Sequence, residues 1–145
     1  MIRIICIGKI KEQYLKEMIN DYSKRIAKYH KLEIVELNEE FTLEKEGKNI
    51  LAKLSNKSYN ILCDLNANQI NSIELSKMID DSFNNFSEIN FIIGSSNGVS
   101  QEVKNAVNKS ISFGRITIPH GLFRSVLLEQ IYRSFKILNN ESYHK

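Results

Sequence analysis

The side chains best suited to chemistry gather in the last 27 residues of the chain. His120 stands in a turn after a proline, Arg124 and Arg133 follow it, and the chain ends in Tyr143-His144-Lys145. Aromatic and basic side chains together can stack on single-stranded RNA and neutralise its phosphates. A solvated helix face and a frayed terminus are the ordinary alternatives, so this segment alone does not decide between them.

His120 fits three roles, which are a general base, a phosphate contact and a plain turn residue. Neither a carboxylate nor a nucleophile is paired with it in sequence, and the chain has no nucleophile elbow or H-E-x-x-H motif. Cys6 and Cys63 lie in separate apolar runs without the spacing of a zinc site or a disulfide framework. We therefore expect buried thiols and no metal, and hydrolase chemistry loses support.

A glycine-bearing loop is the second site of interest. The apolar run Phe91-Ile92-Ile93 leads into Gly94-Ser95-Ser96-Asn97-Gly98. Ligands of parallel sheets bind beyond the carboxyl ends of strands, where glycines let the backbone approach. The loop is not a Walker motif, because Lys-Ser/Thr does not follow its second glycine. A ligand cradle and an ordinary turn both remain open.

Strands and helices are expected to alternate along the chain. Short runs rich in Ile, Val or Phe predict strands at residues 3–7, 32–37, 59–65, 89–93 and 110–116. Apolar residues at helical spacing predict helices at residues 11–29, 43–54, 72–84, 101–108 and 122–138. Asn71 with Glu74, and Ser100, are helix start signals. The alternation predicts an α/β fold, a mostly parallel sheet with helices on both faces.

The apolar stripe of the helix at 122–138 is wider than packing on one sheet face requires. It indicates either a dimer contact or a helix wedged between two elements of its own chain. At 145 residues the chain suits a single domain spanning 1–145.

Composition argues for a cytoplasmic protein. The apolar start is too short for a signal sequence, and no run approaches the ~18 apolar residues of a membrane span. Residues 1–114 carry 15 basic and 15 acidic side chains, whereas residues 115–145 carry 5 basic and 2 acidic ones. The excess of positive charge at the C-terminal end weakly favours a polyanionic partner.

Several of these motifs, taken in order, resemble one known family. They are the segments 93–98, Ser112-Phe113, 117–120, 124–137 and Tyr143-His144-Lys145, together with Ile7-Gly8-Lys9 and Lys45-Glu46-Gly47. The whole chain resembles the ribosomal RNA large subunit methyltransferase H family. The resemblance implies a SPOUT-type fold with a C-terminal deep trefoil knot, which no periodicity could indicate and general topology rules disfavour.

The resemblance also implies a function. Members of the family act as homodimers and use S-adenosylmethionine to methylate N3 of a pseudouridine in a stem-loop of 23S rRNA, in the ribosome or its large subunit. The implied donor site comprises Cys63, Leu65, Gly94, Phe113, Gly114, Arg115, Ile116, Thr117 and Ile118. By the same resemblance we expect His120, Arg124, Tyr143 and His144 near the target base, and Arg133 and Lys145 toward RNA phosphates. The tail of one subunit is expected to complete the pocket of the other.

The chain departs from the family pattern in two places beside the implied donor site. Ser95 stands where the family has a second glycine, and Ala67-Asn68 replaces a Gly-Lys pair. Two other function classes fit the motifs taken alone. They are a non-catalytic, dimeric nucleotide- or RNA-binding module and a structural dimerisation protein; binding of S-adenosylmethionine separates both from the enzyme.

Overall fold

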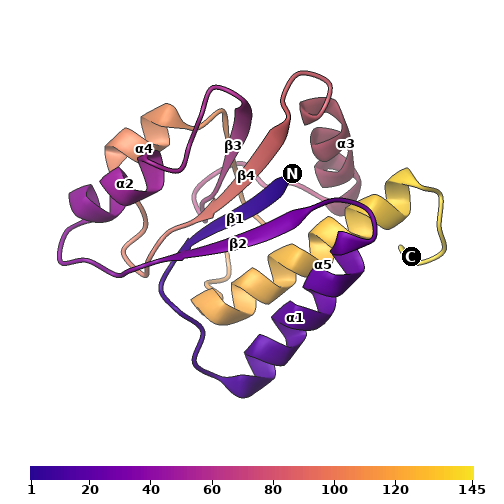
Figure 1. Ribbon diagram of the computed structural model, residues 1–145, viewed down its shortest axis with the longest axis horizontal. Helices are drawn as coiled ribbons and strands as arrows, with labels where there is room; N and C mark the ends of the chain where they lie inside the picture. Colours follow the sequence, from indigo (N-terminus) through magenta and orange to yellow (C-terminus); the bar gives the residue numbers. More distant parts are fainter.

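A computed structural model of the chain describes residues 1–145 and places a parallel sheet at the centre (Figure 1). The strands are β1 (Ile2–Ile7), β2 (Leu32–Leu37), β3 (Ser58–Cys63), β4 (Glu88–Ile93) and β5 (Lys109–Ile111). They lie in the order β2-β1-β4-β3-β5, and every neighbouring pair is parallel. The predicted parallel sheet is confirmed.

Helices cover both faces of this sheet, which was also predicted. They are α1 (Gln13–Ala27), α2 (Leu43–Leu51), α3 (Ser72–Ser82), α4 (Gln101–Ala106) and α5 (His120–Leu138). Figure 1 shows α1, α3 and α5 on one face and α2 with α4 on the other. Asn71 and Glu74 form a complete capping box on α3, and the Ser100 hydroxyl caps α4, so both start signals are confirmed.

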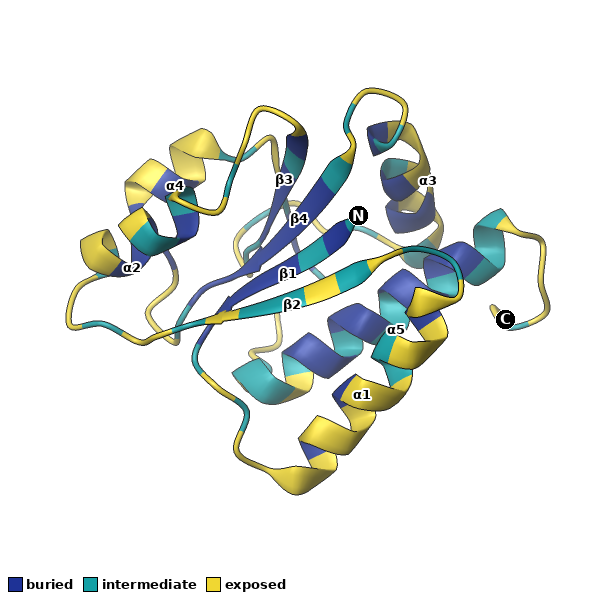
Figure 2. Cartoon of the chain, in the orientation of Figure 1, coloured by how far each residue is buried: buried dark blue, intermediate teal, exposed yellow.

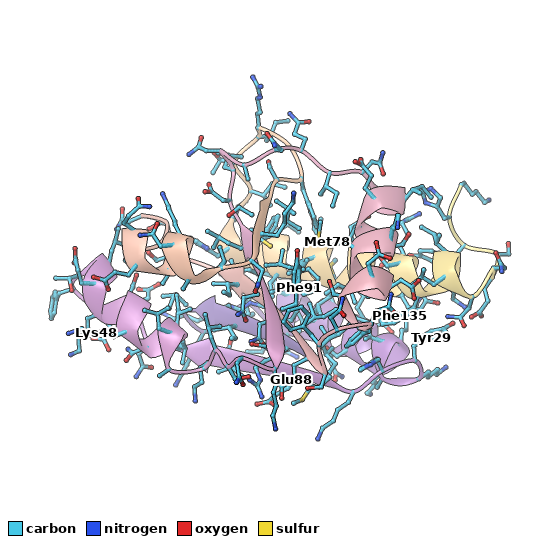
Figure 3. The ribbon with its side chains drawn as sticks, turned by 90° about the horizontal axis from the view of Figure 1, so that it is seen from above. Tyr29, Lys48, Met78, Glu88, Phe91 and Phe135 are labelled. Carbon is cyan, nitrogen blue, oxygen red and sulfur yellow. The ribbon has the colours of Figure 1, made fainter.

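Two hydrophobic cores lie on the two sides of the sheet. Because successive side chains of a strand point to opposite faces, Ile4 and Cys6 of β1 join one core, whereas Ile5 and Ile7 join the other. The larger core lies under α1, α3 and α5, and Figure 2 shows the central strands β1, β3 and β4 largely buried, whereas the edge strand β2 is partly exposed. In Figure 3, Phe91 lies at the centre of the molecule and Phe135 beside it on α5.

The wide apolar stripe of α5 is explained within one chain. The helix packs against α1 on one side and α3 on the other. Its buried residues include Leu127, Leu128, Ile131 and Phe135. The wedged-helix interpretation is therefore the one that the structure confirms, and the stripe gives no separate argument for a dimer.

The predicted fifth strand is wrong in its extent. We expected residues 110–116, but β5 ends at Ile111, and the predicted third strand likewise ends early, at Cys63. The Ser112 hydroxyl bonds to the main chain of Gly114, and Gly114 has a φ of 140°. These features turn the chain out of the sheet, so the apolar residues beyond Ile111 belong to a loop. No helix combines the length and the hydropathy that crossing a membrane requires.

Candidate functional site

A cavity of about 820 Å³ opens at the carboxyl ends of the strands. The loops that follow β3, β4 and β5 form its wall, so the turns that the sequence singled out do converge on one place. Of the residues implied for the site, those that line the cavity are Cys63, Leu65, Gly94, Phe113, Gly114, Arg115, Ile116, Thr117, Ile118 and His120. This volume lies within the range of small-molecule sites.

Ser112 holds the cavity loops together. Its amide donates to Asn68 O at 3.0 Å, and its carbonyl accepts from Ile70 N at 3.0 Å. Its hydroxyl reaches Leu65 O at 3.3 Å and Gly114 O at 2.8 Å. The loop after β3 is thereby fixed to the chain leaving β5, which gives the cavity a defined edge. Asn68, one of the departures from the family pattern, takes part only through its main chain.

The wall formed by residues 115–118 offers unpaired main-chain groups. None of the amides or carbonyls of these four residues hydrogen-bonds within the chain. Ile116 is 82% exposed, although it is aliphatic. Residues 115–117 are exposed, so their amides and carbonyls are free to bind a ligand that has both donors and acceptors.

The loop after β4 explains why position 94 is glycine. Ser95 and Gly98 exchange two main-chain hydrogen bonds, of 3.2 and 2.9 Å, so the loop folds back on itself. A Cβ atom on Gly94 would lie 2.5 Å from Gly98 O and 2.7 Å from Val99 Cγ1. Gly94 is therefore required by the loop's own packing. Ser95 is accommodated here, and its hydroxyl lies 3.4 Å from Gly98 O.

Cys63 contributes an inert thiol to the cavity. Burial raises its pKa to about 12, so the thiol stays protonated near neutral pH. Because the thiolate is the reactive form, Cys63 is unsuited to act as a nucleophile. Its place at the end of β3 gives it a packing role against whatever fills the cavity.

Arg124 lies outside the cavity, in the interior of the protein. Only 3% of its side chain is exposed, and its Nη1 pairs with Glu36 Oε2 at 2.7 Å. Nη2 donates to Gly8 O at 3.2 Å, and the same Glu36 oxygen accepts from Ile10 N at 3.1 Å. Within one chain, Arg124 therefore connects α5 to β2 and to the loop after β1, and its guanidinium does not face the cavity.

The C-terminal tail lies at the opposite end of α5 from His120. The helix has 19 residues, so its two ends are about 27 Å apart. Figure 1 shows the chain end turned back beside the last turns of α5, away from the carboxyl ends of the strands. Tyr143 and His144 thus lie away from the cavity of their own chain.

Arg133 organises this distant end. It pairs with Glu129 one turn earlier, with Nε to Oε1 at 2.9 Å. Its guanidinium lies over the Tyr143 ring at 4.7 Å from the centroid, and its Nη1 is 3.2 Å from His144 Nδ1. Lys145, the last residue, is exposed. Arg133, Tyr143 and His144 therefore form one group, separate from the residues around His120.

Ser112 and Glu36 are positioning residues that the sequence did not indicate. Glu36 is a carboxylate inside a predicted strand, which is a signal that could have suggested a buried partner. Its partner, Arg124, is 88 positions away in the sequence, so the pair itself could not be found without the fold.

Comparisons with known proteins agree with this arrangement. A family model described as "Predicted SPOUT methyltransferase" matches residues 1–144. The ribosomal RNA large subunit methyltransferase H of Fusobacterium nucleatum is 48% identical to this chain, with 99% of each chain covered. The chain belongs to the SPOUT methyltransferase family. Within it, the chain belongs to the ribosomal RNA large subunit methyltransferase H group, since the Clostridium perfringens protein of that name is also 45% identical over 99% of both chains.

The solved structures include a SPOUT neighbour with a similar fold. The SpoU methyltransferase AviRb from Streptomyces viridochromogenes, crystallised with AdoMet, matches with a TM-score of 0.50 over 92% of this chain. Its sequence is 9% identical, and the match spans 57% of its length. This likeness supports the α/β architecture of the present SPOUT methyltransferase.

Proposed function

We propose that this chain transfers the methyl group of S-adenosylmethionine to N3 of a pseudouridine in a stem-loop of 23S rRNA. The observation that carries the proposal is the cavity wall at residues 115–118, whose main-chain groups have no partner in the chain. The names of the full-length relatives support ribosomal RNA of the large subunit as the acceptor.

The residues of the cavity fit S-adenosylmethionine. Unpaired amides and carbonyls suit the edge of adenine, which has both donors and acceptors. Leu65, Ile116 and Ile118 supply apolar surface for the ring, and all three line the cavity. Most recognition would then be by main-chain groups. In the structurally similar AviRb the cofactor is AdoMet, which agrees with this assignment.

When bound, S-adenosylmethionine supplies an electrophilic methyl group on a sulfonium. That methyl carbon would pass from sulfur to the base N3, and the N3 proton would have to leave. The chain's contribution is to orient the base and to receive or relay that proton. Among the four residues implied for the target base, His120 is the one that lines the cavity of its own chain.

Tyr143 and His144 enter the reaction only if a second copy supplies them. They pack against Tyr132 and Arg133, about 18 Å along α5 from His120, and so lie away from the cavity of their own chain. We therefore infer a homodimer in which each tail lies over the cavity of the other subunit. Arg133, which contacts Tyr143 and His144, and Lys145 at the end of the tail would then face the RNA phosphates of that composite site.

Donor binding is tested with two variants at one position. Thr117→Ala keeps the amide and removes the side chain, whereas Thr117→Pro removes the amide donor. Titration calorimetry should show near wild-type affinity for Thr117→Ala and at least a ten-fold loss for Thr117→Pro, about the contribution of one main-chain hydrogen bond. Equal melting temperatures would confirm that both variants fold. Absence of saturable binding to the wild-type protein at millimolar donor would overturn the proposal.

Methyl transfer is tested with labelled donor and ribosomes from a strain that lacks the modification. We expect the label at N3 of a single pseudouridine of 23S rRNA. Label on another base or none would contradict the assignment of the acceptor. His120→Ala should retain donor binding and lose roughly 100-fold or more in turnover.

A complementation experiment tests the shared site. Thr117→Pro damages only the cavity, and Tyr143→Ala damages only the tail, so each homodimer should turn over far more slowly than the wild type when the donor is kept below the dissociation constant of Thr117→Pro. After subunit exchange, half of the dimers are mixed and hold one intact composite site each, which predicts about a quarter of wild-type turnover. If the tail serves its own chain, mixing restores nothing.

A further inference from the structure

The chain turns sharply where α5 ends, and a complete Schellman motif makes the turn. Asn140 has a φ of 54°, in the left-handed region that favours glycine or asparagine. Its amide donates to Ile137 O at 3.1 Å, and the Glu141 amide donates to Lys136 O at 2.9 Å. These are the two hydrogen bonds of the motif, so the direction in which the tail leaves the helix is fixed by the main chain.

The carboxylate of Glu141 then fastens the turn to two elements. Oε2 accepts from Lys136 Nζ at 2.9 Å, and Oε1 accepts from the Tyr29 hydroxyl at 2.8 Å. The Tyr29 ring lies after the end of α1 and stacks on Phe135, with 5.6 Å between centroids (Figure 3). Hydrogen bonds from Lys136 and then Tyr29 lower the pKa of Glu141, so the carboxylate is ionised near neutral pH. We call Glu141, Lys136 and Tyr29 the Glu141 anchor.

The anchor stands two residues before the tail side chains and therefore sets their place. The ring of Tyr143 meets Tyr132 edge-on at 4.9 Å between centroids. Arg133 covers Tyr143 and lies beside His144. The tail is thus held in one arrangement by its own chain before any RNA or second subunit is present.

We propose that Glu141 is a positioning residue that orders the tail in advance for RNA. This inference rests on the proposed function, because it gives the tail its role in methylation. A loose tail loses conformational freedom when RNA binds, and that loss weakens the complex. A tail already held by the anchor avoids most of this loss. The tail is proposed to contact RNA, whereas S-adenosylmethionine is proposed to bind the wall at residues 115–118, so loss of the anchor should not change the affinity for the donor.

Loss of the negative charge and loss of the anchor change RNA binding in opposite directions, so the Glu141→Ala variant distinguishes between them. Removing a carboxylate near a polyanion strengthens RNA binding when electrostatics alone acts. Loss of the anchor weakens it. Glu102 is an exposed carboxylate on α4, across the sheet from the tail, so Glu102→Ala is the control with the same change in net charge.

We expect Glu141→Ala to raise the KM for ribosomal substrate by roughly ten-fold, the effect of freeing a few side chains before binding. The dissociation constant of the donor should stay unchanged. Tyr29→Phe removes one hydroxyl and keeps the stack on Phe135, so a smaller rise is expected. In the Glu141→Ala background, Tyr29→Phe should add nothing, because the two residues act as one unit. Asn140→Gly preserves the left-handed turn and should behave like the wild type.

Two outcomes would overturn the inference while leaving the proposed function intact. One is an active wild-type enzyme for which Glu141→Ala has an equal or lower KM for ribosomal substrate. The other outcome is a mobile tail in the wild type, measured without RNA as backbone order parameters from NMR relaxation. We expect about 0.85 in the wild type and below about 0.6 in Glu141→Ala. Low values in both would show that no anchored tail exists, whatever the activity.

Discussion

Replacing Glu36 by alanine leaves the guanidinium of Arg124 buried without its carboxylate. Arg124 is 3% exposed, and Gly8 O would be its remaining partner. Loss of one member of a buried ion pair costs about 3–5 kcal/mol, because the other charge stays uncompensated. A chain of this size loses about 4 °C in Tm per kcal/mol, so the expected fall is roughly 12–20 °C.

Replacing the other partner, Arg124, should lower the free energy of unfolding by less, because the two partners differ in exposure. The Glu36 side chain is 34% exposed, so water can solvate its carboxylate after Arg124→Met. The loss is then close to that of charged hydrogen bonds, about 1.5–3 kcal/mol. The double variant should be no less stable than Glu36→Ala alone, since it removes the uncompensated charge.

Urea unfolding followed by circular dichroism measures all three variants in one double-mutant cycle. We expect the free energy of unfolding of Arg124→Met to exceed that of Glu36→Ala. That of the double variant should equal or exceed that of Glu36→Ala. If Arg124→Met is the less stable single variant, the reasoning from burial is refuted. Retained donor binding in Arg124→Met would agree with its place outside the cavity.

Three further predictions concern other parts of the chain. Cys63, with a pKa of about 12, should resist iodoacetamide at pH 8 in the native protein and react after unfolding, as mass spectrometry can show. Burial lowers the pKa of His30 from its usual 6.5, so the unfolded state binds more protons than the folded state. The free energy of unfolding should therefore fall as pH drops below 6.5. In urea titrations at several pH values, His30→Gln should make the free energy of unfolding less dependent on pH. Asn71→Ala removes the capping box of α3 and should cost about 1 kcal/mol, whereas the exposed Asn20→Ala should cost almost nothing, a difference that thermal melts would resolve.

The sequence was sufficient for the layers of the fold. Alternating apolar runs and helical stripes predicted every strand and helix, because each element buries one face and the pattern records it. It failed at residues 112–116, where aliphatic and aromatic residues resemble a strand. They are apolar because they line a cavity, and Ser112 and Gly114 turn the chain by local hydrogen bonds and a positive φ.

The site was predictable in part, for a similar reason. The glycine loop follows β4 and the segment leading to His120 follows β5, and the carboxyl ends of parallel strands meet at one edge of a sheet. No local pattern could show that Arg124 is turned inward, because its partner lies on β2. Nor could it show that the tail is held far from the cavity, which depends on the straight course of α5. The trefoil knot implied by the resemblance stays a prediction.

The length of α5, 19 residues, fixes the distance between the cavity end of this molecule and the end that carries the C-terminal tail. Inserting one residue in the helix would advance the tail by about 1.5 Å and swing it by about 100°, which breaks any match with a second subunit. A loop such as 38–42 absorbs the same insertion locally. We therefore expect length changes in this family member to be tolerated between elements and excluded from its last helix.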